Sequence, residues 1–245
     1  MKPTVRPSFY DAFKCVGAAC RVSCCTGFRI SLLPGEEKRL PRESLAEDSR
    51  SRYVVMRPNG DCPFWTAAHR CALQHGDDQS VLPGVCRVFP RVVSPYSDRT
   101  EIYLDAYCPE VYRLVSTWEI GDFRISGGPL SDAPVWRQRA EQMDAYRTLE
   151  LPGTAPVFVD YLRRLGAYLV FTNFPIYKDY PAAQGVFGPV RRFIEEMAGR
   201  SREFATVNGE WFDFLCREWR KYSSAYGFDF ETEGCYKTQE EMVGK

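Results

Sequence analysis

Residues 13–30 read FKCVGAACRVSCCTGFRI, a segment with cysteines at positions 15, 20, 24 and 25. Four more cysteines follow at irregular spacing, at positions 62, 71, 86 and 108. Eight of the ten cysteines in this 245-residue chain therefore lie within its first 108 residues, whereas Cys216 and Cys235 lie far downstream. This concentration indicates that the chemistry of the protein depends on its thiols.

The clustered cysteines are better suited to metal binding than to disulfide bonding. Disulfide-rich domains are usually short and secreted, but this chain is 44% hydrophobic and its start, MKPTVRPSFYDAF, lacks the apolar stretch of a signal peptide. The adjacent Cys24 and Cys25 do not pair with each other in ordinary disulfide geometry. Reduced thiolates that cluster in the cytosol most often bind a metal. We therefore expect a cytoplasmic metal-binding protein.

The spacing of the cysteines favours an iron–sulfur cluster, with [4Fe–4S] first and zinc as the alternative. Structural zinc sites favour C-x2-C pairs, and the sequence contains none. Iron–sulfur clusters take four thiolates and tolerate varied spacing. Eight cysteines suffice for one cluster with spare thiols, for two clusters, or for one cluster and a zinc ion. His69 and His75 flank Cys71, but among so many thiols we expect them to be surface or hydrogen-bonded residues.

Three arginines lie near the cysteines in sequence and are candidates for the cofactor site. Arg21 lies in the first cysteine segment, and Arg87 and Arg91 follow Cys86. Four thiolates around zinc or an oxidised cubane leave about two net negative charges, which nearby cations would offset. Spacing alone is equally consistent with ordinary solvated arginines.

Charge and missing motifs exclude several classes of function. Thirty-two basic residues balance 32 acidic ones, so no overall field attracts nucleic acid or anionic lipid. The longest apolar run of interest, residues 167–171, is far shorter than a membrane span. The sequence has no G-x-G-x-x-G, P-loop, H-E-x-x-H or G-x-S-x-G motif. Residues 20–25 also do not fit the C-x3-C-x2-C signature of radical S-adenosylmethionine enzymes. We expect no nucleic-acid or membrane partner.

The patterns predict an α+β fold whose halves differ. We expect residues 1–126 to form an irregular, Cys-rich metal-binding region with short hairpins, and residues 127–245 to form a mainly helical region. The boundary is expected at the turn Gly127-Gly128-Pro129.

Within the first half, residues 28–32 alternate like a strand. Residues 53–57 and 62–65 resemble a hairpin with an Asn59-Gly60 turn, and residues 91–93 and 101–104 a second hairpin. A helix is expected to begin at Pro109. Later expected helices cover residues 131–146, 157–172, 190–197 and 211–222. The inward-facing residues expected in the second are Val157, Phe158, Tyr161, Leu162, Leu165 and Leu169, and the apolar stripe of the third is Val190, Phe193, Ile194 and Met197.

Three sequence blocks resemble the flagellin lysine-N-methylase family. The first is residues 13–30, which fit the family's opening C-x4-C-x3-C-C-x-G followed by an aromatic residue and a short strand. The second runs from CPFW (62–65) to CRVFPR (86–91), and the third is CPEVYRL (108–114). The first two blocks are also similar to a wider group of Cys-cluster proteins described as zinc- or iron-chelating domains.

The resemblance implies an iron–sulfur protein that transfers methyl groups from S-adenosylmethionine to lysine side chains of flagellin or of another surface protein or peptide. The family's metal-binding cysteines map onto Cys15, Cys20, Cys24, Cys25, Cys62, Cys71, Cys86 and Cys108. The resemblance does not fix which four hold one cluster. The alternatives are a zinc- or iron-chelating module without catalysis and an electron-transfer protein.

No catalytic residue is evident from the sequence, but three aromatic residues are candidate walls for a methyl-transfer pocket. Methyl transfer needs a neutral lysine amine in line with the sulfonium methyl, and desolvation favours the neutral amine. Trp65, Tyr103 and Tyr107 are candidates because aromatic rings hold sulfonium ions by cation–π contact. Ordinary packing is the stronger expectation for each. Cys216, beside the apolar stripe of its helix, is expected to be a buried apolar residue, and Cys235 lies in a polar tail.

Overall fold

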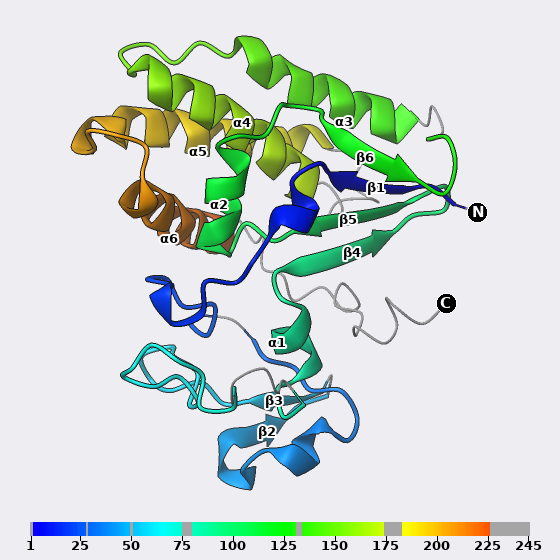
Figure 1. Cartoon of the computed structure of the whole chain (residues 1–245), viewed down its shortest axis with the longest axis vertical. Coiled ribbons are helices and arrows are strands. Elements are labelled where there is room, and N and C mark those ends of the chain that lie inside the picture. Colours follow the sequence, from blue (N-terminus) through cyan, green and yellow to red (C-terminus); the bar gives the residue numbers. More distant parts are fainter. Residues whose placement is uncertain are drawn as a thin grey trace. The chain divides into compact units, whose positions relative to one another are not determined.

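The computed structural model describes residues 2–27, 29–49, 51–74, 80–130, 134–173 and 183–225, and it divides into two compact units (Figure 1). The sheet–helix unit contains the described residues up to 14 and from 93 to 225, and the cysteine unit contains residues 15–92. This division differs from the sequence-based partition at residue 126, because residues 93–126 belong with the later helices.

The sheet–helix unit is built on a four-stranded sheet with strand order β4-β5-β1-β6. The strands are β1 (Thr4–Pro7), β4 (Arg91–Pro95), β5 (Thr100–Leu104) and β6 (Phe123–Ser126). Strand β1 pairs parallel to β5 and antiparallel to β6. The hairpin of β4 and β5 confirms the sequence-based prediction, and its turn is closed by the Tyr96 N–H, which donates to the Arg99 carbonyl at 2.8 Å.

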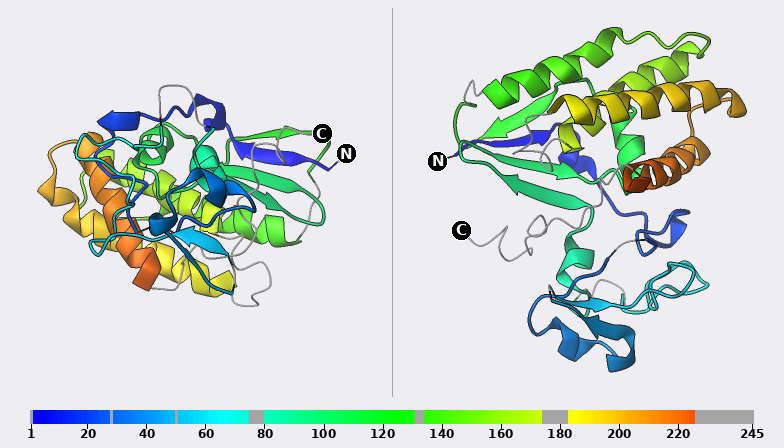
Figure 2. Two further views of the ribbon diagram at one scale, coloured as in Figure 1. Left: turned by 90° about the horizontal axis from the view of Figure 1, so that it is seen from below. Right: turned by 180° about the vertical axis from the view of Figure 1, so that it is seen from behind.

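Five α-helices complete this unit, and α3, α4 and α5 lie along one face of the sheet (Figure 2). They are α2 (Pro109–Val115), α3 (Pro134–Asp144), α4 (Pro156–Asn173), α5 (Ala183–Arg200) and α6 (Gly209–Ala225), with 3-10 turns at Tyr10–Ala12, Ala145–Thr148 and Ser201–Glu203. Helix α2 begins at Pro109 as predicted, with Cys108 as its N-cap residue. None of the described helices is long and apolar enough to cross a membrane.

Helix α4 packs on the sheet through aromatic residues. The ring of Phe171 lies 5.8 Å from that of Tyr103 on β5 and 4.8 Å from that of Phe123 on β6, between ring centroids. The Tyr168 hydroxyl donates to the Leu104 carbonyl at 2.5 Å. The predicted apolar stripe of this helix is confirmed except at its start, because Val157, expected to face inward, is 55% exposed.

A buried ion network joins helix α3 to strand β5 in the same unit. Glu101 is fully buried and accepts from Arg99 Nε at 2.6 Å and from Arg139 Nη1 at 2.7 Å. The Arg139 guanidinium also lies 4.7 Å from the Trp136 ring centroid. Glu101 is therefore shared by two guanidinium groups, and Arg99 also pairs with Asp98 at 2.9 Å.

The cysteine unit has little regular structure. Strands β2 (Leu45–Glu47) and β3 (Arg52–Val54) form a two-stranded antiparallel sheet, and helix α1 (Gly84–Val88) has five residues. Short 3-10 turns are η2 (Gly17–Ala19), η3 (Glu36–Arg39) and η4 (Arg42–Ser44). Its core of fully buried side chains consists of Ile30, Leu32, Leu40, Val54 and Cys62.

Two sequence-based predictions in this unit need correction. The expected strand 28–32 forms only a single bridge, between Ser31 and Tyr53, and residue 28 lies outside the described residues. Strand β3 pairs with β2 rather than with residues 62–65. The Asn59-Gly60 turn itself is present, since the Gly60 N–H donates to the Arg57 carbonyl at 2.8 Å and Gly60 has φ +84°.

Candidate metal centre

Four cysteines of the cysteine unit lie around one part of its core and form what we call the four-thiol cluster: Cys25, Cys62, Cys71 and Cys86. Cys62 is 3% exposed and belongs to the core, and Cys25 and Cys86 pack against that core. Cys71 is joined to the same region by its β-bridge with Trp65, which also packs there. These thiols come from four segments that are far apart in sequence.

Backbone hydrogen bonds hold three of these segments together. The Cys62 N–H donates to the Cys25 carbonyl at 2.7 Å, and the Trp65 N–H turns back to the Cys62 carbonyl at 3.0 Å. The Ala72 N–H donates to the Phe64 carbonyl at 2.7 Å, which fixes the segment that carries Cys71. The positions of the thiols thus follow from loop closure rather than from a regular element.

The environment of the four-thiol cluster disfavours bare thiolates. Burial raises the pKa of Cys62 to about 11 and also raises the pKa of Cys71. Burial raises the pKa of Cys86 well above its usual value, and repulsion from the charges of Cys25, Cys62 and Cys71 adds to this effect. Without a cation Cys62, Cys71 and Cys86 therefore favour the protonated form, and a metal ion must displace their protons to bind.

Arg57 is a cation at this site that the sequence-based reasoning missed. Its guanidinium donates to the Pro63 carbonyl at 2.6 Å and to the Trp65 carbonyl at 3.2 Å. Its charge lowers the pKa of Cys62, against the larger effect of burial. Arg57 lies five residues before Cys62, and the Asn59-Gly60 turn brings it back over the segment that follows this cysteine.

The three arginines predicted to lie at the cofactor site differ in their surroundings. Arg87 lies on α1, and its Nη2 is 3.5 Å from a carboxylate oxygen of Glu36. Arg91 is the half-buried first residue of β4, and Arg21 is exposed. Their predicted role at the cofactor site stays a prediction.

The donor set fits a thiolate-bound metal, although the thiols are not gathered in ligating geometry. Among the residues that the structure describes, no group of three His, Cys, Asp or Glu side chains is arranged to hold a metal ion. Four thiols around a buried core nevertheless match the donors that zinc and iron–sulfur clusters take. Cys25, Cys62, Cys71 and Cys86 are therefore the residues that would hold such a group.

The other predicted ligands lie elsewhere. Cys15 and Cys24 are exposed, and Cys20 donates to the Val22 carbonyl of its own loop at 3.0 Å. Cys108 is buried in the sheet–helix unit at the start of α2. Their role as ligands remains a prediction from the sequence.

Of the two histidines that flank Cys71, the structure describes only His69. His69 is exposed, and its ring lies edge-on to Trp65 with 5.8 Å between ring centroids. His75 lies outside the described residues.

The aromatic residues proposed as walls of a methyl-transfer pocket make ordinary packing and hydrogen-bond contacts in the structure. Tyr103 is 3% exposed and lies edge-on to Phe171, and the Tyr107 hydroxyl is 2.8 Å from the Ser223 hydroxyl. Both belong to the sheet–helix unit, whereas Trp65 belongs to the cysteine unit. Cys216 is fully buried, as predicted, and donates to the Tyr107 carbonyl at 3.3 Å.

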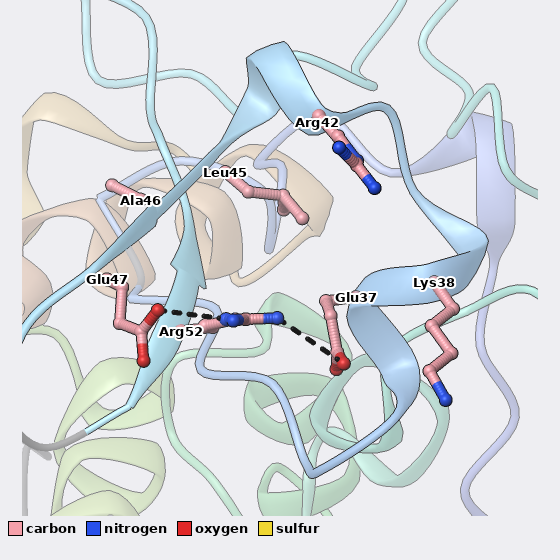
Figure 3. Close-up of a pocket in the computed structure, with 7 residues that line it drawn as sticks. All are labelled: Glu37, Lys38, Arg42, Leu45, Ala46, Glu47 and Arg52. Carbon is pink, nitrogen blue, oxygen red and sulfur yellow. Dashed lines mark hydrogen bonds and ion pairs between the residues drawn. The ribbon is translucent and has the colours of Figure 1, made fainter.

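A pocket of about 570 Å³ opens on the cysteine unit beside η3 and strands β2 and β3. Its lining residues are Glu37, Lys38, Arg42, Leu45, Ala46, Glu47 and Arg52 (Figure 3). Arg52 extends between Glu47 at 3.0 Å and Glu37 at 3.4 Å, so its charge is balanced within the pocket. None of the cysteines in the described part of the chain lines this pocket.

Comparison with known proteins found relatives of one kind. No family model matches the sequence, and no solved structure matches it. The chain is 26% identical over 125 residues to proteins named lysine-N-methylase from Salmonella typhimurium and Salmonella choleraesuis, in matches that cover 43% of this chain and 30% of each relative. It is equally similar to the flagellar biosynthetic protein FliU of Salmonella muenchen, where the match covers 72% of that protein. These matches confirm the resemblance to lysine-N-methylases, although the chain spans less than a third of the two full-length relatives.

Proposed function

We propose that the four-thiol cluster binds an iron–sulfur cluster and that the protein takes part in protein-lysine methylation. The observation that carries the metal proposal is the meeting of Cys25, Cys62, Cys71 and Cys86 from separate loops around one buried core. Four thiolates are the ligand set of a [4Fe–4S] cluster. The bound group would add covalent links between loops that backbone hydrogen bonds already hold together, and it would supply a centre for electron exchange.

The methylation proposal is supported by the similarity to lysine-N-methylases. In this reaction the lone pair of a neutral lysine amine attacks the methyl carbon of S-adenosylmethionine. The carbon–sulfur bond breaks, S-adenosylhomocysteine leaves, and the amine nitrogen loses a proton. Such a reaction depends chiefly on holding amine and methyl group in line. The proposed substrate is flagellin or another surface protein.

The metal proposal is tested on protein purified without oxygen. We expect iron and acid-labile sulfide, together with the brown colour and broad visible absorption of an iron–sulfur cluster. Cys25→Ser and Cys86→Ser should lose iron, whereas Cys216→Ser in the sheet–helix unit is a matched control that should retain it. Stoichiometric zinc without sulfide would reject the iron–sulfur proposal and favour the zinc alternative.

The methylation proposal is tested with methyl-labelled S-adenosylmethionine and purified flagellin. We expect label in lysine residues of flagellin when the metal-loaded protein is present, and none when flagellin is replaced by a version with acetylated lysines. If the loaded protein transfers no label to flagellin or to other surface proteins, the result favours the alternative proposal, a metal-binding module without catalysis. A redox titration of the cluster then distinguishes a structural module from an electron-transfer protein.

A further inference from the structure

Glu36 is a buried carboxylate that neither metal binding nor methyl transfer, as proposed above, requires. It is 7% exposed and lies at the start of η3. One carboxylate oxygen accepts from the Leu33 N–H at 2.9 Å, and the other accepts from the Gly84 N–H at 2.7 Å. The Arg87 guanidinium lies 3.5 Å from the second oxygen. This carboxylate therefore joins two segments that are about fifty residues apart.

The contact with Gly84 fixes the segment that carries Cys86. The Cys86 N–H donates to the Pro83 carbonyl at 2.9 Å, so residues 83–86 form one tight turn at the start of α1. Because Gly84 lies inside this turn, holding its N–H also holds Cys86. Loss of the acceptor would leave a buried N–H unsatisfied, which destabilises the turn that carries Cys86.

The negative charge of Glu36 lies beside the segment that carries Cys86. Its carboxylate is bound to the Gly84 N–H, two residues before this cysteine. Arg87, which follows Cys86 in sequence, pairs with the same carboxylate. Glu36 therefore contacts the chain on both sides of Cys86.

We propose that Glu36 is a positioning residue for the metal centre, which holds Cys86 at the four-thiol cluster through the Gly84 N–H and acts on the bound group through its negative charge. This inference rests on the proposed metal binding. Groups that orient metal ligands typically change metal affinity by about 10–100-fold when they are removed. Glu36 has the two features that such a group needs, a fixed backbone contact beside a ligand and a charge close to it.

The neighbouring carboxylate, Glu37, provides a matched control. It lies one residue further along η3, accepts from the Gly35 N–H at 2.8 Å, and pairs with Arg52 in the pocket shown in Figure 3. A Glu37→Gln variant therefore removes the same charge from the same 3-10 turn. Glu37 differs from Glu36 in that its carboxylate is directed toward Arg52 rather than toward Gly84, and in being partly exposed.

The test compares the wild-type protein with Glu36→Ala, Glu36→Gln and Glu37→Gln, all loaded with iron and sulfide. Loss of iron to a chelator is measured without oxygen. We expect Glu36→Ala to bind iron about 10-fold more weakly or worse, Glu36→Gln to lose less because its amide oxygen still accepts one N–H, and Glu37→Gln to match the wild type. The midpoint potential of the cluster should shift to a more positive value in Glu36→Gln, since a negative charge near the site is removed.

Each outcome has a distinct meaning. Equal iron retention in Glu36→Ala and the wild type would overturn the positioning role. Equal weakening in Glu36→Gln and Glu37→Gln would also overturn it, because the effect would then be a general loss of charge or stability in η3. An unchanged potential in Glu36→Gln would overturn the electrostatic part, and this variant keeps the test decisive where Glu36→Ala does not fold. A wild-type protein that binds no metal would instead reject the proposed metal binding itself.

Discussion

Removal of the metal is expected to unfold the cysteine unit while the sheet–helix unit stays folded. The main core cluster of the cysteine unit has five buried side chains, and burial of each contributes about 1.5–3 kcal/mol. Binding of a structural metal by thiolates is worth about 10–16 kcal/mol in zinc-finger peptides, as much as this core as a whole. Because a typical domain is stable by only about 5–15 kcal/mol, loss of the metal should remove the net stability of this unit.

The sheet–helix unit has its own apolar core. Trp211, Leu215 and Trp219 on α6 are fully buried, as is most of the second half of α4. Five α-helices belong to this unit, whereas α1 in the cysteine unit has five residues. The helical circular dichroism signal should therefore change little when the metal is removed.

Limited proteolysis and circular dichroism of the metal-loaded and chelator-treated protein provide the assay. We expect new cleavage sites within residues 15–92 and protection of residues 93–225. Residues 4–7 should remain with the protected fragment, because β1 pairs with β5 and β6. Cys25→Ala should behave like the stripped protein and Cys216→Ser like the loaded one. A stripped protein that resists cleavage throughout residues 15–92 would refute the reasoning and leave the metal a purely functional role.

Three further changes test other parts of the structure. Glu101→Gln removes the buried carboxylate that Arg139 and Arg99 share, although Arg99 keeps its pair with Asp98, so we expect a loss of about 3–5 kcal/mol in the free energy of unfolding, measured by denaturant titration; a change below 1 kcal/mol would contradict the buried network. Arg57→Ala should weaken iron retention about 10-fold because it loosens the segment after Cys62, with Arg42→Ala as the surface control; equal retention in both would argue against a role for Arg57. Cys235→Ser should leave the iron content unchanged, and loss of iron would show that the ligand set is wrong.

Helices and the β4–β5 hairpin could be predicted from the sequence because local patterns specify them. The stripe of Val190, Phe193, Ile194 and Met197 is fully buried or nearly so in α5, as its spacing predicted. The helix itself is longer than expected, from Ala183 to Arg200. Apolar periodicity identifies the buried face of a helix well and its ends poorly.

Strands β1 and β6 were not predicted, because each has four residues and neither pairs with its neighbour in sequence. Short strands acquire their stability from cross-strand partners, and Thr4 pairs here with Ser126, more than a hundred residues away. The error over β3 has a different cause, because β3 forms a local pair with β2, the strand immediately before it, instead of pairing across the Asn59-Gly60 turn. The sheet also joins residues on both sides of the Cys-rich segment, because β1 near the start of the chain pairs with β5 and β6.

The spacing of the cysteines in the sequence does not determine which of them lie together in the fold. The sequence indicated a cysteine-rich metal site, but eight cysteines were equivalent in that reasoning, and Cys108 was grouped with the others because it lies in the first half. In the structure it belongs to the sheet–helix unit. Cys25, Cys62, Cys71 and Cys86 lie together because of loop-closing contacts between segments.

These loop-closing contacts are made by residues that resemble ordinary surface charges in the sequence. Arg57 is carried back by the Asn59-Gly60 turn to the carbonyls of Pro63 and Trp65. Glu36 is one of two adjacent glutamates, and nothing in its spacing distinguishes it from Glu37. Only the folded chain directs one carboxylate to Gly84 and the other to Arg52. A metal site built on loops therefore depends on residues outside its ligand motif, and substitutions at Glu36 and Arg57 should affect metal binding more than their sequence context suggests.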